Sequence, residues 1–511
     1  MNQSKSNTET AGIEPAGAKQ RGHWFFLLLL FTAYYTLIAS PAVNSYLLHD
    51  PDVWWHLRTG QWIVEHKAFP FMDSFSQPLQ GQRWYAYSWL FEVLLYGVFS
   101  HYGLLGVVGL TVILCLLIAL ALYIHVRRFV TNDLWAMGFA LLGALGLAPL
   151  CNPRPWLFTI LFFIIEYTLL IAARQTGKQR LRWWLVPLFA LWANLHIQFI
   201  YGLFLLGFDT VQPWLEEALQ RNFDRGRWAA QLDLQRWLLL LACGLATLAT
   251  PYHYKIYWVV FEYAGGKRAF QLVTELGPLK FSSFGDWVVL GLALWAIFWL
   301  GWQQLTKRAS LLLLLIGIMV ALRSHRDIWF LMVIAIGIPA AALAGREQSV
   351  APIFSTRTRN SLQAAAVLLT CLLLGGLAQR RQLSNPTLQR AVDEHFPAAA
   401  ARVIEERGYH GPLYNHFNWG GYLIWRLPQL PVSMDGRTNL YGDARIVNHF
   451  DVWNGKRQWA QDSDLTTAGI VLTAPGQPLS ELLRNDPRFE LVYNDNVALL
   501  FRPRAHLLAQ R

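Results

Sequence analysis

Apolar runs recur along almost the whole chain, and they constrain its fold more than any other feature. A membrane-spanning α-helix needs about 20 predominantly apolar residues, and many of the runs approach that length. The 511 residues are 54% hydrophobic and only 15% charged, whereas soluble proteins carry about 25% charged residues. The pattern predicts a polytopic α-helical membrane protein.

We expect about eleven spans. Their approximate bounds are residues 24–43, 102–124, 134–150, 156–173, 184–195, 199–215, 236–250, 286–302, 309–322, 327–344 and 362–379. Residues 1–23 are polar, which predicts a disordered cytoplasmic tail. The run from Trp24 is too long for a signal-peptide core, so an uncleaved first span should open a transmembrane domain over residues 24–379.

Basic residues in the connecting loops predict the orientation of the spans. With a cytoplasmic N-terminus, the inner loops carry more Lys and Arg than the outer ones, most clearly between Arg174 and Arg182. The fifth and sixth spans could form one helix broken at Asn194-Leu195-His196, but the basic loop 345–361 would then lie outside. The charge rule favours two spans, with the long 44–101 loop and the C-terminal region outside the cytoplasm.

The net charge of +11 follows from the same loops. Because the basic residues cluster between spans, they indicate topology rather than a nucleic-acid surface, and we expect no nucleic-acid partner. The four cysteines lie in or next to apolar runs. The C-terminal region therefore has neither a disulfide framework nor a thiolate metal site.

From Arg380 onward the apolar runs shorten to strand length and alternate with helical stretches. This predicts a small extracytoplasmic α/β domain over residues 380–511, with a mainly parallel sheet. Its expected strands lie within residues 411–415, 432–435, 470–472 and 489–493. Gly436-Arg437 follows a strand end, a common place for ligand contacts, and Gly420-Gly421 is interpreted as a tight turn.

Asp50-Pro51-Asp52 opens the most unusual segment of the chain, directly after the first span. Two acids, two histidines and an arginine alternate with tryptophans between residues 49 and 60. A span would exclude these charges and a linker would lack the aromatic residues, so the segment predicts a site. Trp54, Trp55 and Trp62 also predict an amphipathic helix that lies in the membrane interface. Asp52 could instead be the cap of that helix.

Further ionisable residues fall at the same predicted face of the membrane. They are Arg154, His196, His253, Lys255, Arg323, His325 and Arg326. Ionisable groups at membrane depth are costly unless they pair or line a cavity, so their collection at one face indicates a shared pocket. Single arginines at loop ends can instead reach lipid phosphate, and a lone histidine is often structural.

Several segments together resemble the GT-C superfamily of integral-membrane glycosyltransferases. They are the DPDVWWHLRTG run from Asp50 to Gly60, Phe69-Pro70 with Asp73-Ser74-Phe75-Ser76, Asn152-Pro153-Arg154-Pro155, Asn418-Trp419-Gly420-Gly421-Tyr422-Leu423 and Asp435-Gly436-Arg437. More closely, the chain resembles a bacterial group of large membrane proteins that carry a DPDxWWHLxxG motif after the first span. The resemblance extends over most of the chain.

The resemblance implies inverting transfer of a sugar from a polyprenyl-phosphate carrier to an acceptor hydroxyl, at the outer face of the bacterial cytoplasmic membrane. A carboxylate at the end of the first span would be the general base, and cations would hold the departing phosphate. Asp50 and Asp52 match the acidic position, and position alone favours Asp50. Arg154, Arg323 and Arg326 are the phosphate candidates, because a guanidinium fork suits phosphate oxygens.

The remaining candidates for substrate binding are His56, Arg58, Asp73, His196 and His253. The Asp-Pro-Asp spacing also admits a divalent metal, Mg²⁺ or Mn²⁺, held by Asp52 with His56 or Asp73. Some GT-C members need a metal and others do not, so the resemblance leaves this open. The acceptor could be a glycan, a lipid or a protein. The Gly420-Gly421 and Asp435-Gly436-Arg437 segments could bind it, or could be only a turn and a strand end.

A second class of function is non-enzymatic: a flippase for lipid-linked glycans, or a scaffold in envelope polysaccharide assembly. A flippase should place its charges near the bilayer midplane, whereas these charges lie at loop ends. A scaffold would tolerate Asp50→Asn and Asp52→Asn. A polymerase or ligase of whole glycan chains would share most of the same features.

Overall fold

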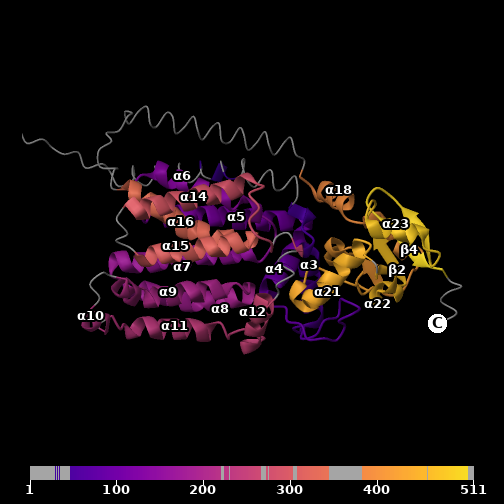
Figure 1. Cartoon of the computed structure of the whole chain (residues 1–511), viewed down its shortest axis with the longest axis horizontal. Coiled ribbons are helices and arrows are strands. Elements are labelled where there is room, and N and C mark those ends of the chain that lie inside the picture. The colour runs from indigo at the N-terminus through magenta and orange to yellow at the C-terminus, as the bar shows by residue number, and fades with distance from the viewer. Residues whose placement is uncertain are drawn as a thin grey trace, which may run out of the picture.

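The computed structural model describes residues 47–219, 224–229, 231–265, 272–273, 276–302, 308–344, 383–456 and 458–504, together with residues 29, 31, 32 and 34. The expected tail 1–23, most of the first expected span and the expected span 362–379 lie outside the described residues. Figure 1 shows a bundle of long helices at one end and a domain with a sheet at the other, with short helices between them.

The bundle consists of helices that lie side by side along its length (Figure 1). They are α5 (Leu104–Val126), α6 (Asp133–Gly146), α7 (Trp156–Thr176), α8 (Leu185–Leu195), α9 (Phe199–Ala218), α11 (Leu234–Ala246), α14 (Phe284–Trp302), α15 (Arg308–Arg323) and α16 (Ile328–Ala344). In the described chain, 4 segments are long and apolar enough to cross a membrane: α5, α7, α14 and residues His325–Leu343. The protein is therefore a membrane protein by composition and helix length, but the expected count of about eleven spans is not confirmed.

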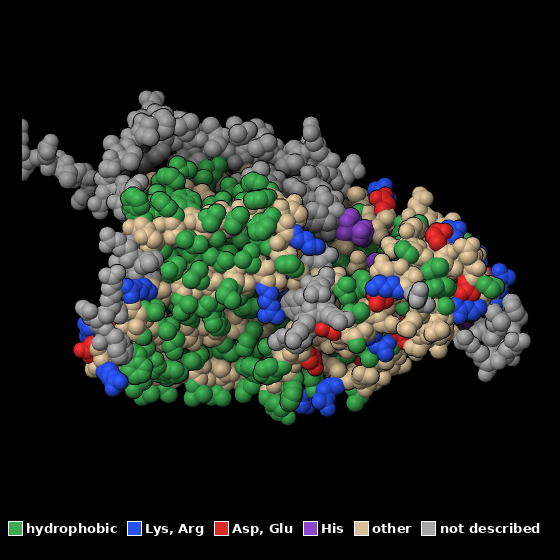
Figure 2. All heavy atoms as spheres, in the orientation of Figure 1, with side chains coloured by type: hydrophobic (Ala, Val, Ile, Leu, Met, Phe, Trp, Pro, Cys, Tyr) green, Lys and Arg blue, Asp and Glu red, His purple; other side chains and the backbone are tan. Residues whose placement is uncertain are grey.

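Apolar side chains cover the outside of the bundle as well as its core. Leu117, Phe204, Leu241 and Phe298 are exposed on four different helices. Figure 2 shows hydrophobic side chains over most of the visible bundle surface and charged ones at its ends and on the C-terminal domain. A helix that is apolar all round suits a lipid environment.

The break after Leu195 separates two helices of opposite direction. His196, at the break, hydrogen-bonds Thr159 near the start of α7. Asp209, in the second half of α9, instead pairs with Arg174 near the end of α7. Helix α9 therefore runs in the direction of α7, and α8 runs the opposite way. The prediction of two helices rather than one is confirmed.

Two helices of the 44–101 loop lie between the bundle and the C-terminal domain. They are α3 (Asp52–His66) and α4 (Trp89–Tyr102), preceded by the short η2 (Leu47–His49). The prediction that the aromatic face of α3 lies in the membrane interface is wrong. Trp54 packs edge-on against Phe396 and Tyr422 of the C-terminal domain, and Trp55 packs against Trp84. Protein rather than lipid buries these rings because α20 and α4 both pack on α3.

Short elements complete the bundle and its ends. They are η3 (Ala148–Leu150), η4 (Gln179–Trp184), α10 (Arg225–Ala229), η5 (His253–Lys255), α12 (Ile256–Gly265) and η6 (His325–Asp327). We call the end of the bundle that faces α3 and the C-terminal domain the domain end. The other end, with α10, is the far end (Figure 1).

The C-terminal domain places helices around a four-stranded sheet of order β1-β2-β4-β3. Its elements are α18 (Asn385–His395), α19 (Ala398–Glu406), β1 (Leu413–Asn415), η8 (Phe417–Trp419), α20 (Gly420–Arg426), α21 (Thr438–Trp453), η9 (Trp459–Gln461), α22 (Ser463–Thr466), β2 (Ile470–Thr473), α23 (Pro478–Asn485), β3 (Phe489–Asn494) and β4 (Leu499–Pro503).

The prediction of a mainly parallel sheet is wrong. Only β1 and β2 pair in parallel, whereas β4 is antiparallel to both β2 and β3. The reason is the tight connection after β3, where Asp495 accepts hydrogen bonds from the backbone of Val497 and Ala498. A connection this short makes a hairpin, because parallel strands need a long crossover. The expected strand at 432–435 forms only isolated bridges through Val432.

Candidate functional site

The two acids of the Asp50-Pro51-Asp52 motif share one arginine. Asp50 Oδ2 accepts hydrogen bonds from Arg154 Nε at 2.7 Å and from Asn152 Nδ2 at 2.8 Å. Arg154 Nη1 donates to Asp52 Oδ2. Both acids and the arginine are buried. The segment between η3 and α7 carries Asn152 and Arg154, so the start of α7 positions the cation against the motif.

Asp50, and not Asp52, accepts a hydrogen bond from a backbone N–H at the start of α3. Asp50 Oδ1 accepts from the backbone N–H of Asp52 at 3.0 Å. Asp52 is itself the first helical residue. The alternative of Asp52 as the helix cap is therefore wrong, because its carboxylate points toward Arg154. Both oxygens of Asp50 accept hydrogen bonds from the protein.

Two glycine motifs of the C-terminal domain close over the acidic motif. A Cβ on Gly436 would lie 1.8 Å from Asp52 Oδ1, and a Cβ on Gly421 would lie 2.2 Å from the carbonyl oxygen of Pro51. A Cβ on Gly420 would lie 2.0 Å from the carbonyl oxygen of Met434. Gly420 and Gly421 lie inside α20, so the interpretation as a tight turn is wrong. These glycines permit close backbone approach, a use that turn chemistry does not reveal.

Asp73 lies apart from the acid pair and binds the C-terminal domain. Arg437 Nη1 donates to Asp73 Oδ1 at 2.6 Å, and Asp435 accepts from Arg437 Nε and Nη2 at 2.8 and 2.7 Å. The Arg437 guanidinium also stacks on Phe75 and Trp84, with ring centroids 5.2 and 4.7 Å away. This fully buried cluster fixes the 44–101 loop to the domain.

His56 pairs with Glu92, which the sequence did not single out as a site residue. His56 Nδ1 lies 3.1 Å from Glu92 Oε1, and both side chains are buried. Burial raises the pKa of Glu92 well above its usual range. Burial, assisted by Arg154 and His196, lowers the pKa of His56 well below its usual range. Burial thus disfavours the charged form of both groups.

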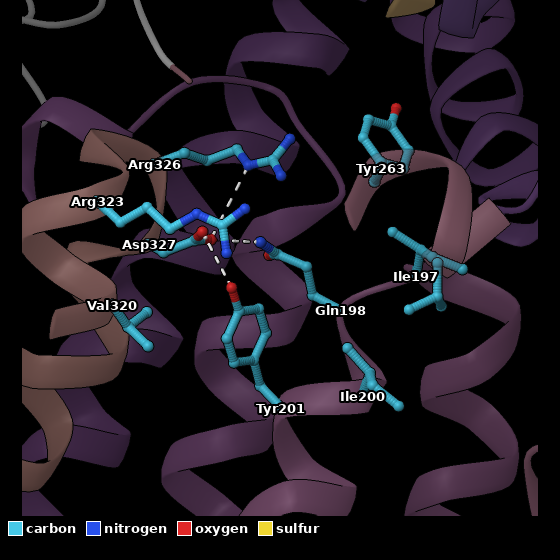
Figure 3. A pocket seen from close by; sticks show the side chains of 10 residues that line it. Ile197, Gln198, Ile200, Tyr201, Tyr263, Val320, Arg323, Arg326 and Asp327 are labelled. Atoms are coloured by element: carbon cyan, nitrogen blue, oxygen red, sulfur yellow. Dashed lines mark hydrogen bonds and ion pairs between the residues drawn. The ribbon is translucent and has the colours of Figure 1, made fainter. Parts of the chain in front are cut away.

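A cavity of about 230 Å³ opens at the domain end of the bundle (Figure 3). Its polar lining residues are Gln198, Tyr201, Tyr263, Arg323, Arg326 and Asp327, and its apolar ones are Ile197, Ile200, Val260 and Val320. Gln198 and Tyr201 donate to Asp327 at 2.7 and 3.0 Å. Arg326 Nε lies 3.9 Å from Asp327 Oδ1, and the Arg326 guanidinium lies over the Tyr263 ring. Two guanidinium groups thus share one cavity with an apolar wall.

His196 connects the acid pair electrostatically with this cavity. It lies at the break between α8 and α9, where Thr159 holds its Nδ1 at 2.9 Å. Burial lowers the pKa of His196 well below its usual range, and Arg326 and Arg154 lower it further. Gln198, two residues after His196, donates a hydrogen bond to Asp327, so the break between α8 and α9 lies beside this cavity.

Two predicted site residues lie away from this region. Arg58 bonds Gln61 and pairs with Glu65 on its own helix. His253 is exposed and its Nδ1 lies 3.2 Å from the carbonyl of Leu248. The structure thus joins Asp50, Asp52 and Arg154 directly. It places His56 and His196 within their electrostatic reach, puts Arg323 and Arg326 in the cavity, and uses Asp73 in the domain contact.

Sequence reasoning missed Asn152, Glu92, Gln198, Tyr201, Tyr263 and Asp327 as site residues. Asp327 directly follows Arg326 at a predicted loop end, so its acid could have been noticed. Gln198 and Tyr201 follow the helix break by a few residues. Tyr263 and Glu92 carry no local signal, because only helix packing brings them to the site.

The residues present do not fit a bound divalent metal as expected from the Asp-Pro-Asp spacing. Asp50 and Asp52 would have to hold the ion, and Arg154 already bridges them. His56 faces Glu92, and Asp73 faces Arg437. Within the part of the chain that the structure describes, no group of three or more His, Cys, Asp or Glu side chains could hold a metal ion.

No protein-family model matches this chain, and no curated protein matches its sequence. Solved structures of the Archaeoglobus fulgidus oligosaccharyltransferase do match. The form tethered to an acceptor peptide with an NVT sequon superposes with a TM-score of 0.55 at 13% identity, covering 90% of this chain and 70% of that one. The apo form superposes with a TM-score of 0.55 at 10% identity, covering 90% of this chain and 70% of that one. A third structure shows this archaeal enzyme, AglB, in complex with an inhibitory peptide and a dolichol-phosphate. It superposes with a TM-score of 0.55 at 10% identity, covering 89% of this chain and 70% of that one. The chain therefore has a fold similar to that of this archaeal oligosaccharyltransferase.

Proposed function

We propose that this protein is a membrane glycosyltransferase that moves a sugar from a polyprenyl-phosphate carrier to an acceptor hydroxyl, with inversion. One observation carries the proposal: a buried acid pair and a two-arginine cavity lie at the same end of a membrane bundle with an oligosaccharyltransferase fold. The archaeal neighbour is recorded with an acceptor peptide and with a dolichol-phosphate. A lipid-linked donor and a separate acceptor suit both parts of the site.

The acid pair supplies the general base. The acceptor oxygen attacks the anomeric carbon, the bond from that carbon to the phosphate oxygen breaks, and the acceptor proton passes to a carboxylate. A single displacement of this kind inverts the anomeric centre. Asp50 accepts hydrogen bonds from the N–H of Asp52, from Asn152 and from Arg154, which supports Asp50 as the group that orients the motif and leaves the role of base to Asp52. This reverses the preference that position alone gave to Asp50.

The cavity at the domain end receives the donor phosphate. Arg323 and Arg326 present guanidinium groups, which bind phosphate oxygens through paired N–H donors. Ile197, Ile200 and Val320 form an apolar wall beside them, suited to the first units of a prenyl chain. The charges of Arg326 and Arg154 both act on His196, which supports a phosphate held near the acid pair.

The cellular setting belongs to the same proposal. We place the site at the extracytoplasmic face of a bacterial cytoplasmic membrane, with a cytoplasmic N-terminus and an extracytoplasmic C-terminal domain. The resemblance of the sequence to the bacterial DPDxWWHLxxG group supports this placement. The acceptor is a glycan, a lipid or a protein that the C-terminal domain helps to present.

A binding assay and a cellular assay test the proposal together. Protein in lipid nanodiscs is titrated with a short polyprenyl phosphate, and binding is followed by tryptophan fluorescence. Arg326→Ala should weaken binding at least about tenfold, because a charge-assisted contact of about 1.5–3 kcal/mol is lost. Arg407→Ala, an exposed arginine on the C-terminal domain, is the matched control and should bind normally.

Asp52→Asn separates catalysis from binding. It should keep polyprenyl-phosphate affinity while transfer in cells falls about 100-fold or more, as expected for loss of a general base. Cells with this variant should accumulate sugar-loaded carrier. Normal glycan in cells with Asp52→Asn would favour a flippase or scaffold, and absence of carrier binding by the wild type would reject the proposal.

A further inference from the structure

The acid pair needs a positive partner, because two buried carboxylates in contact repel each other. Asp50 and Asp52 are only 7% and 6% exposed, so water screens them little. In many enzymes a divalent ion held by carboxylates meets this need. Here the positive partner is a side chain of the protein.

Arg154 meets both acids along two edges of its guanidinium group. Its Nε lies 2.7 Å from Asp50 Oδ2, and its Nη1 donates to Asp52 Oδ2. The guanidinium group also lies over the Trp156 ring, with its Cζ 4.9 Å from the ring centroid. Asn152 Nδ2 and the N–H of Asp52 bind the same Asp50 carboxylate at 2.8 and 3.0 Å. In all three of these contacts, Asp50 accepts a hydrogen bond from a donor group of the protein.

We propose that Arg154 is the permanent cation of this site and takes the place that a divalent metal would occupy. A metal ion bridging the two acids would compete with Arg154, which already binds Oδ2 of Asp50 and Oδ2 of Asp52. The guanidinium is always charged in proteins, so the acid pair keeps its countercharge whatever the metal supply. The site therefore works without Mg²⁺ or Mn²⁺.

The inference deepens the proposed glycosyl transfer and rests on it for the meaning of the site. Arg154 holds the two acids in their geometry and places one positive charge beside the reacting centre. It is a positioning residue for the base Asp52. Its test needs neither donor nor acceptor, so failure of the proposed transfer and failure of this inference can be told apart.

A measurement of Mn²⁺ affinity tests the proposed role of Arg154 directly. Purified protein in nanodiscs is titrated with Mn²⁺, and free Mn²⁺ is followed by electron paramagnetic resonance. The wild type should show no binding that depends on Asp52, so it should behave like Asp52→Asn. Arg154→Ala removes the guanidinium and exposes the two carboxylates to the ion. It should bind Mn²⁺ at least tenfold more tightly than the wild type.

Two further variants identify the source of any gain in Mn²⁺ affinity. Arg154→Ala combined with Asp52→Asn should lose the new Mn²⁺ site. Arg326→Ala removes a nearby positive charge but leaves Arg154 on the acids, so it should gain none. Wild-type binding that Asp52→Asn abolishes would overturn the inference, as would a folded Arg154→Ala variant with no gain. If Arg154→Ala does not fold, the comparison of wild type with Asp52→Asn decides alone.

Discussion

Gly436 approaches Asp52 so closely that no side chain fits between them. A Cβ at this position would lie 1.8 Å from Asp52 Oδ1. Gly436→Ala should therefore turn the carboxylate away from its position, while the fold survives because the displaced atom ends a flexible side chain. Displacement by about 1 Å can cost about 100-fold in rate. We expect glycan transfer in cells to fall at least tenfold with a nearly unchanged midpoint of thermal unfolding.

The control for this variant is Gly97→Ala. Gly97 lies in α4, where a Cβ would meet no atom within 4 Å, and alanine favours helix. Transfer and thermal midpoint should both match the wild type. Full transfer by Gly436→Ala would show that the position of the Asp52 carboxylate is unimportant.

Arg437 neutralises two carboxylates, Asp73 and Asp435, in a fully buried cluster. Arg437→Ala should lower the free energy of unfolding by about 3–5 kcal/mol, because it leaves buried charge without a partner. Arg437→Lys should be intermediate, since an ammonium group cannot reproduce the fork. Thermal unfolding of the purified variants measures the effect.

The Arg426–Glu405 pair of the same domain provides the comparison. Its side chains are 35% and 34% exposed, so solvent screens the pair. Arg426→Ala should cost no more than about 1 kcal/mol. Equal effects of Arg437→Ala and Arg426→Ala would contradict the structural role of the buried cluster.

At the scale of elements, the contact of α20 with α3 joins the C-terminal domain to the acidic motif. A Cβ on Gly421 would lie 2.2 Å from the carbonyl oxygen of Pro51. Backbone atoms cannot turn away as a carboxylate can, so Gly421→Ala should push α20 off α3. We expect faster cleavage of the C-terminal domain in limited proteolysis, with Gly109→Ala as an unaffected control because its Cβ position is open.

The element that positions the cavity is the pair α8 and α9. Its reversal brings His196, Gln198 and Tyr201 to the domain end and carries Asp209 to the far end. One continuous helix over residues 185–218 would place His196, Gln198 and Tyr201 near its middle instead of at the domain end. The reversal therefore decides which polar groups can reach Asp327 and its arginine neighbours.

At the scale of the whole molecule, stability should depend on pH through buried histidines. Burial, assisted by His416, lowers the pKa of His449 to about 3. Histidine in an unfolded chain has a pKa of about 6.5, so between these values the unfolded state binds more protons. The free energy of unfolding should fall as pH falls below about 6.5, by about 1.4 kcal/mol per pH unit for this group. Above that pH its contribution is constant.

Thermal unfolding from pH 7.5 to 4.5 checks this dependence. His449→Phe keeps an aromatic ring and cannot be protonated, so its midpoint should fall less steeply with decreasing pH than that of the wild type. Identical slopes would mean that His449 is protonated in the folded protein at these pH values.

The orientation of the molecule in the membrane is a prediction at the same scale. Met72 and Tyr254 are exposed near the domain end, and Lys178 is exposed near the far end. With a membrane-impermeant maleimide, cysteines at Met72 and Tyr254 should be labelled in intact spheroplasts, and a cysteine at Lys178 only after permeabilisation. The labelling uses a Cys371→Ser background, in which the remaining native Cys115, Cys151 and Cys243 are buried. Opposite accessibility of Met72 and Tyr254 would reject a site shared across the domain end.

The sequence predicted the helical membrane class and the break between α8 and α9, and it singled out several segments that carry the candidate site. It did so because apolar periodicity and charged loops are local signals. It did not predict the antiparallel strands, the burial of the α3 tryptophans by protein, or the role of Gly420 and Gly421. Each of these depends on which distant segment packs alongside, and a residue pattern does not record that.

The amino-acid sequence alone determined that this chain is a helical membrane protein with a charged, tryptophan-rich motif after its first apolar run. Only the tertiary structure decided which cation serves which acid. Arg154 reaches Asp52 across a sequence separation of 102 residues, and Arg437 reaches Asp73 across 364. Buried charges must find partners wherever the packed helices bring them, because leaving them unpaired in a medium of low polarity is too costly.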